Sequence, residues 1–81
     1  MIIEKELIQI EGRANMAQAG PWKAYIEDRD HESGADFIRT GSGENIEMLG
    51  ATTADYDFIA NARQDIPRLI HEIRILRDKS M

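Results

Sequence analysis

The chain has 81 residues and a net charge of −5, from 15 acidic and 10 basic side chains, and it contains no cysteine. The lack of cysteine excludes disulfides and thiolate metal sites, and the acidic balance argues against binding of duplex nucleic acid, which needs a positive face. No apolar run approaches the roughly 20 residues that cross a bilayer, so we expect a cytoplasmic protein that does not bind membranes.

A chain of this length is expected to form a single domain, residues 1–81. Such a domain buries only about 60% of the surface that its unfolded form exposes. Small domains therefore usually need a disulfide, a metal ion or self-association. Because cysteine is absent, we expect a homo-oligomer, most simply a dimer.

The first predicted element is a helix over residues 2–18. Its apolar residues recur at spacings of three and four, which places them on one helix face. They are Ile3, Leu7, Ile10, Ala14 and Ala17. Gly20 can take the left-handed cap conformation, and Pro21 cannot continue a helix, so the helix ends before them.

Three short strands are predicted next, over residues 22–27, 37–40 and 46–49. In the first, Trp22, Ala24 and Ile26 alternate with residues that face the other side, as in a half-buried strand. Turns over residues 28–34 and 41–43 separate the strands. These connections are too short for parallel crossovers, so the strands are expected to form an antiparallel meander.

The last third of the chain is predicted to be helical, with Thr52 or Thr53 as its N-cap. Its apolar residues alternate spacings of three and four over nearly three heptads, which is the pattern of a coiled-coil seam. They are Ile59, Ala62, Ile66, Leu69, Ile73 and Leu76. Pro67 removes a backbone hydrogen bond, so we expect this segment to be kinked or split near Asp65–Pro67. The predicted fold class is α+β, with an N-terminal helix, a three-stranded antiparallel meander and this C-terminal segment.

Short motifs for metals and catalysis are incomplete in this sequence. The acidic turn that begins at Asp28 has Ser33 and Arg39 where a calcium loop needs glycine and glutamate. His71 begins a zinc-protease motif, but Ile75 stands where the second histidine belongs. We therefore predict no metal, no cofactor, no catalytic residue and no enzymatic activity.

Basic and aromatic residues give the candidate ligand site. Arg63 and Arg74 fall on one side of the C-terminal segment, with Arg68 nearby, and arginine matches the geometry of phosphate and carboxylate groups. Trp22 and Tyr25 supply stacking surfaces on opposite faces of the sheet. We predict that these five residues bind a small anionic, nucleotide-like ligand between subunits. The alternative is a solvated helix face whose arginines pair with acids of the same segment.

The tripeptide Gly20-Pro21-Trp22 and the segment Ala54 to Ile70 form a recognisable pattern, of which Asp57–Leu69 is the most specific part. The sequence resembles a family of small phage and prophage proteins, the ead-like accessory proteins. The resemblance covers nearly the whole chain, and these residues carry it. That family has no established general activity, so the resemblance implies no catalytic residue. It implies a phage accessory gene that acts in the cytoplasm of the host bacterial cell, where such genes often counter host defences.

Three functions remain open at this point. The predicted function is a non-enzymatic counter-defence protein that sequesters a small nucleotide-like signal in an oligomeric assembly. The alternative is a protein-interaction module that inhibits a host protein through its apolar helical face. An enzyme such as a phosphodiesterase ranks last, because no metal or catalytic constellation is visible.

Overall fold

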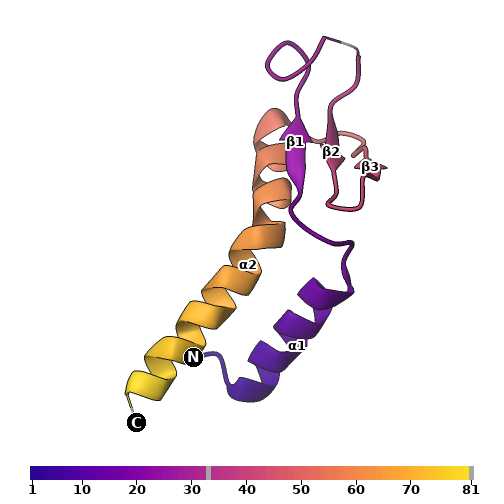
Figure 1. Ribbon diagram of the computed structural model, residues 1–81. Helices are drawn as coiled ribbons and strands as arrows, with labels where there is room; N and C mark the ends of the chain where they lie inside the picture. The colour runs from indigo at the N-terminus through magenta and orange to yellow at the C-terminus, as the bar shows by residue number, and fades with distance from the viewer. Residues whose placement is uncertain (33, 81) are drawn as a thin grey trace.

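The computed structural model describes residues 1–32 and 34–80 and has two helices and a small sheet (Figure 1). The elements are α1 (Glu4–Met16), β1 (Lys23–Tyr25), β2 (Phe37–Arg39), β3 (Asn45–Ile46) and α2 (Thr53–Lys79). The strands pair antiparallel in the order β1-β2-β3. The predicted α+β fold is therefore confirmed. Ser33, in the predicted turn over residues 28–34, lies outside the described residues.

The strands are shorter than predicted because side chains take the backbone hydrogen bonds at their ends. The side-chain amide of Gln64 forms hydrogen bonds with both the N–H and the C=O of Trp22, so β1 begins at Lys23, one residue later than predicted. The N–H of Ile26 donates to the Asp30 carboxylate, and β1 ends before it. The N–H of Met48 donates to the hydroxyl of Tyr56 on α2 rather than to β2, which ends the third strand early.

The prediction of a left-handed helix cap at Gly20 is wrong. α1 ends at Met16, and Ala17 already has an extended backbone with φ −68° and ψ 159°. The segment that follows α1 is held instead by a backbone hydrogen bond, in which the N–H of Gly41 donates to the carbonyl oxygen of Ala19 at 2.7 Å. This bond joins the α1–β1 connection to the turn that follows β2.

α2 is one continuous helix of 27 residues with Pro67 inside it. Of the two predicted forms, the split helix is therefore not observed, and Figure 1 shows a bend in the axis of α2 near its middle. Thr52 is the N-cap, as predicted: its hydroxyl accepts from the N–H of Asp55, and the Asp55 carboxylate accepts from the N–H of Thr52. This reciprocal pair satisfies two backbone donors at the start of the helix.

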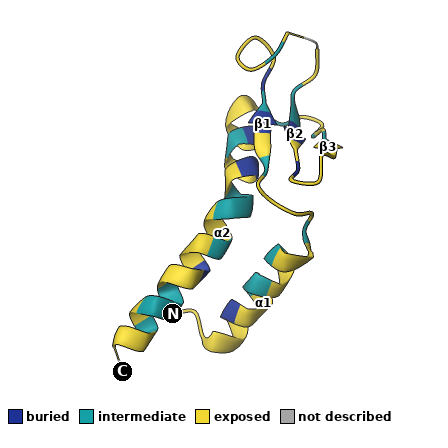
Figure 2. Ribbon diagram, viewed as in Figure 1, coloured by how far each residue is buried: buried dark blue, intermediate teal, exposed yellow. Residues whose placement is uncertain are grey.

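The core has two parts, both visible as dark-blue segments in Figure 2. The larger part lies between the sheet and the first turns of α2, and it comprises Ala24, Ile26, Ile38, Tyr56 and Ala60. The smaller part lies where α1 packs against α2, and it contains Leu7 and Ile70. Most of the rest of both helices is exposed or half-buried (Figure 2).

The molecule is elongated, with extents of 52 × 20 × 20 Å. Its Cα radius of gyration is 15.5 Å, whereas a compact domain of this length has a radius of about 12 Å. The second half of α2 and all of α1 extend beyond the sheet (Figure 1). Neither helix has the length and hydropathy of a membrane span, within the described residues.

Gly41 offers a test of the contact between the α1–β1 connection and the turn that follows β2. A Cβ at this position would overlap the carbonyl group of Gly20 and lie 2.8 Å from the carbonyl oxygen of Ala19. We expect Gly41→Ala to destabilise the fold by about 1–3 kcal/mol, the usual cost of overpacking. The control is Gly12→Ala in α1, where no atom lies within 4 Å and where alanine should stabilise the helix by about 1 kcal/mol. Urea unfolding of both variants measures the difference; equal stabilities would contradict the close contact.

Candidate functional site

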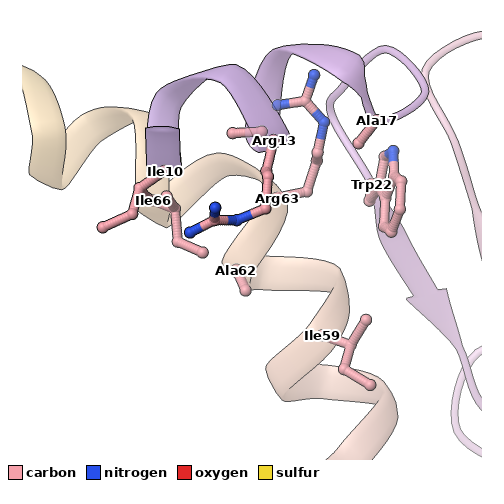
Figure 3. A pocket seen from close by; sticks show the side chains of 9 residues that line it. Ile10, Arg13, Ala17, Trp22, Ile59, Ala62, Arg63 and Ile66 are labelled. Atoms are coloured by element: carbon pink, nitrogen blue, oxygen red, sulfur yellow. The ribbon is translucent and has the colours of Figure 1, made fainter. Parts of the chain in front are cut away.

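A groove of about 370 Å³ opens between α1, α2 and the residue that precedes β1 (Figure 3). Most of its wall is apolar, and three of its side chains are alanines, which are too short to close the space between the helices. Its residues are Ile10, Arg13, Ala14, Ala17, Trp22, Ile59, Ala62, Arg63 and Ile66. Figure 3 shows Arg13 and Arg63 between the two helices, with Trp22 at one end of the groove and Ile10 and Ile66 at the other.

Hydrogen bonds fix the indole and one guanidinium of the groove to the same atom. The carbonyl oxygen of Gln18 accepts from the indole Nε1 of Trp22 at 3.0 Å and from Nε of Arg63 at 2.9 Å. The Gln64 amide accepts from the N–H of Trp22 at 2.6 Å and donates to its carbonyl oxygen at 3.0 Å. Trp22 is therefore held through both its backbone and its ring.

The groove carries two positive charges without a matching negative charge. Neither Arg13 nor Arg63 forms an ion pair with any of residues 1–32 and 34–80. Arg63 uses only its Nε for the bond to Gln18, so its two terminal amino groups are open to another acceptor. Two guanidinium groups in one partly apolar groove favour an anion, because the attraction is stronger where less water surrounds the charges.

Arg74, which was predicted to be a ligand residue, forms ion pairs with α1. Its guanidinium lies 2.6 Å from the Glu11 carboxylate and 3.5 Å from that of Glu4. The hydrogen bond from Arg74 holds the pKa of Glu11 below its ordinary value of 4.5. The partners of Arg74 thus lie on the other helix, whereas the alternative interpretation placed them on the same segment.

Tyr25 and Arg68 also lie away from the groove. Tyr25 is on the outer face of the sheet, where its ring stacks on Phe37 with centroids 5.2 Å apart, and Lys23 Nζ lies 5.0 Å from its ring centre. Arg68 lies in a shallow surface pocket of α2, beside Asp65. Of the five predicted ligand residues, the structure brings together only Trp22 and Arg63.

Sequence reasoning missed Arg13 as a groove residue. Its signal was nonetheless present, because Arg13 follows Ile10 by three positions and precedes Ala17 by four, which places all three on one helix face. The ligand site predicted from the sequence contains only arginines of the C-terminal segment. Arg13 and Arg63 lie in the same groove only because of the way in which α1 packs against α2.

Comparison of the chain with protein-family models, with curated proteins and with solved structures finds no match. The resemblance to phage accessory proteins therefore stays a prediction. Within residues 1–32 and 34–80, no group of three or more histidine or acidic side chains is placed to hold a metal ion.

The ion pair of Glu11 predicts how stability depends on pH. Because the folded protein lowers the pKa of Glu11, the pair stabilises the fold above the unfolded pKa and is lost as pH falls through the lowered one. We expect Glu11→Gln to lower the melting temperature at pH 7, and this difference from the wild type should shrink below pH 4.5.

The control for this experiment is Glu47→Gln, since the exposed Glu47 carboxylate has no ion pair within the described part of the chain. It should melt like the wild type at pH 7. An unchanged melting temperature for Glu11→Gln across the whole pH range would contradict a stabilising role for the pair.

Proposed function

We propose that the protein is a non-enzymatic binding protein that sequesters a small anionic, nucleotide-like ligand in the groove between α1 and α2, as part of an oligomeric assembly. The observation that carries the proposal is the presence of Arg13 and Arg63 in one groove without a carboxylate partner among the described residues. A bound phosphate or carboxylate would supply the missing negative charge, since arginine binds such groups with two parallel hydrogen bonds.

The rest of the groove suits the organic part of such a ligand. Its volume falls within the range of about 300–1,000 Å³ that is usual for small-molecule sites, and its walls combine apolar side chains with few polar groups, as such sites do. Trp22 offers an aromatic ring that its hydrogen bond to Gln18 already orients. A nucleobase stacked on an aromatic side chain contributes about 1–3 kcal/mol.

The side chains that line the groove support binding rather than catalysis. Its polar side chains are the two arginines and the indole N–H of Trp22. A guanidinium stays protonated in proteins, and an indole only donates a hydrogen bond. None of these three groups accepts a proton or attacks a substrate, so the groove can hold a ligand without changing it.

The resemblance to phage accessory proteins supplies the setting of this proposal. In that setting the protein acts in the cytoplasm of a host bacterial cell and binds a nucleotide signal of a defence system, so that the signal no longer reaches its receptor. This function requires affinity and abundance, and it does not require a catalytic centre.

A second candidate function is a protein-interaction module that inhibits a host protein through the apolar face of α2. It is favoured by the exposure of Phe58, Leu69 and Leu76, whose exposed fractions are 74%, 61% and 57%. This alternative predicts that a polar change such as Leu69→Glu abolishes activity in the host, whereas Arg13→Gln leaves it intact. The ligand proposal predicts that Arg13→Gln abolishes it.

Calorimetry of the purified protein against cyclic nucleotides and ADP-ribose-type nucleotides tests the ligand proposal. We expect one class to bind with measurable heat, and we expect Arg13→Gln to weaken that binding roughly tenfold to hundredfold, because a hydrogen bond to a charged group contributes about 1.5–3 kcal/mol. Arg13 makes no hydrogen bond or ion pair within the described residues, so this substitution should leave the fold intact.

Arg68→Gln is the matched control, since Arg68 is exposed on α2 outside the groove. It should bind like the wild type. The proposal fails if no nucleotide of the panel gives heat, or if the two substitutions weaken binding equally.

A further inference from the structure

The face of the sheet that is turned away from α2, here called the outer face, carries aromatic and basic side chains. The inward residues Ala24 and Ile38 are buried in the core that α2 covers. The outward residues alternate with them along the strands, and they are Lys23, Tyr25, Phe37, Arg39 and Asn45. Within the described residues α1 packs against α2 and not against a strand, so neither helix covers the outer face.

Three aromatic rings lie together on this side of the sheet. Tyr25 and Phe37 are directly opposite each other on β1 and β2, and their rings stack with centroids 5.2 Å apart and planes 13° from parallel. The imidazole of His31 lies 5.2 Å from the Phe37 ring, measured between centroids. All three residues are half-buried, so part of their surface stays open to solvent.

Two positive charges lie beside these rings. Lys23 Nζ is 5.0 Å from the ring centre of Tyr25, and the guanidinium carbon of Arg39 is 5.4 Å from the ring centres of both Tyr25 and Phe37. Neither cation forms an ion pair with any of residues 1–32 and 34–80. The Nε of Arg39 donates to the side-chain oxygen of Asn45 at 3.1 Å, which leaves its two terminal amino groups for another acceptor.

We propose that the outer face binds single-stranded nucleic acid, as a second site that is separate from the groove. Lys23 and Arg39 contact phosphates of the strand, and a base stacks on the ring of Tyr25. Proteins that bind single strands without sequence preference combine these two features, a positive surface along the backbone and aromatic side chains for the bases. A duplex does not fit in the same way, because its bases are already stacked on one another.

The charges and the rings together favour this ligand over three other occupants. An acidic peptide would pair with the cations but would leave the aromatic rings unused. A membrane surface would be contacted by protruding apolar side chains, and none of the large exposed apolar residues in the described part of the chain lies on a strand. A symmetric contact with a second copy would bring the unpaired cations of both copies into one interface.

Fluorescence anisotropy with a labelled oligothymidylate of about 10 nucleotides tests the proposal. We expect a dissociation constant of about 1–100 µM at physiological salt, which is the usual range for binding without sequence preference. The logarithm of the binding constant should fall with the logarithm of the salt concentration with a slope of about −1.4, because each of two neutralised phosphates contributes about −0.7. Arg39→Gln should weaken binding and reduce this slope to about −0.7, since one phosphate contact is lost.

Tyr25→Leu separates stacking from charge. We expect affinity to fall roughly tenfold, because stacking of a base on an aromatic ring contributes about 1–3 kcal/mol, and we expect the salt slope to stay unchanged. Leucine keeps an apolar side chain in β1, and circular dichroism checks the fold of the variant. An unchanged affinity in a folded Tyr25→Leu protein would overturn the stacking role. The result with Arg39→Gln is independent of this check, because Arg39 is exposed.

Arg68→Gln and Arg13→Gln are the matched controls, since each removes the same charge from another surface, α2 and the groove respectively. Both variants should keep the affinity and the salt slope of the wild type. The proposal is overturned if the oligonucleotide does not bind, or if Arg68→Gln weakens binding as much as Arg39→Gln does. It is also overturned if a duplex or polyglutamate competes as strongly as the unlabelled single strand.

The two sites can be tested separately in the same protein. Arg39→Gln should leave the binding of ADP-ribose and cyclic nucleotides in the groove unchanged, because Arg39 lies on the outer face and does not line the groove. A protein that binds the oligonucleotide but none of these nucleotides would refute the proposed function alone. A protein that binds a nucleotide but no oligonucleotide would refute the second site alone.

Discussion

The hydrogen bonds that tie Trp22 to α2 determine where the groove lies and which residues face it. Gln64 holds both backbone groups of Trp22, and the carbonyl oxygen of Gln18 joins the Trp22 indole to Arg63. These bonds connect the end of α1, the start of the sheet and the middle of α2 at one point. This connection sets the direction in which α1 runs along α2. It therefore also brings Arg13 to the same groove as Arg63.

Because α1 packs along only one side of α2, the fold leaves much apolar surface exposed to solvent. The sheet covers the first turns of α2, and Leu7 and Ile70 bury a small second core farther along. The second half of α2 keeps large exposed apolar side chains, with Leu69 at 61% and Leu76 at 57%. Burial of such surface against a partner would contribute about 25 cal/mol per Å².

Features set by local sequence could be predicted, and features set by tertiary contacts could not. The Thr52 cap and the alternation around Ala24 follow from local sequence, whereas the buried residues of α2 are Tyr56, Ala60 and Ile70 and not those of the predicted seam. The ends of the strands depend on side chains distant in sequence, such as Gln64 for β1. For the same reason Trp22 and Arg63 were predicted as site residues but Arg13 was not, and Arg74 was placed in the site although α1 supplies its carboxylate partners.

Trp22 is the single tryptophan of the chain and it lines the groove, so its fluorescence can report on binding there. Titration of the protein with ADP-ribose and cyclic nucleotides, followed by the emission of Trp22, is the most direct test of a ligand site there. If a nucleotide stacks on the indole between Arg13 and Arg63, its addition should quench the emission in a saturable way. Emission that stays unchanged for every nucleotide would show that the groove does not bind this class of ligand.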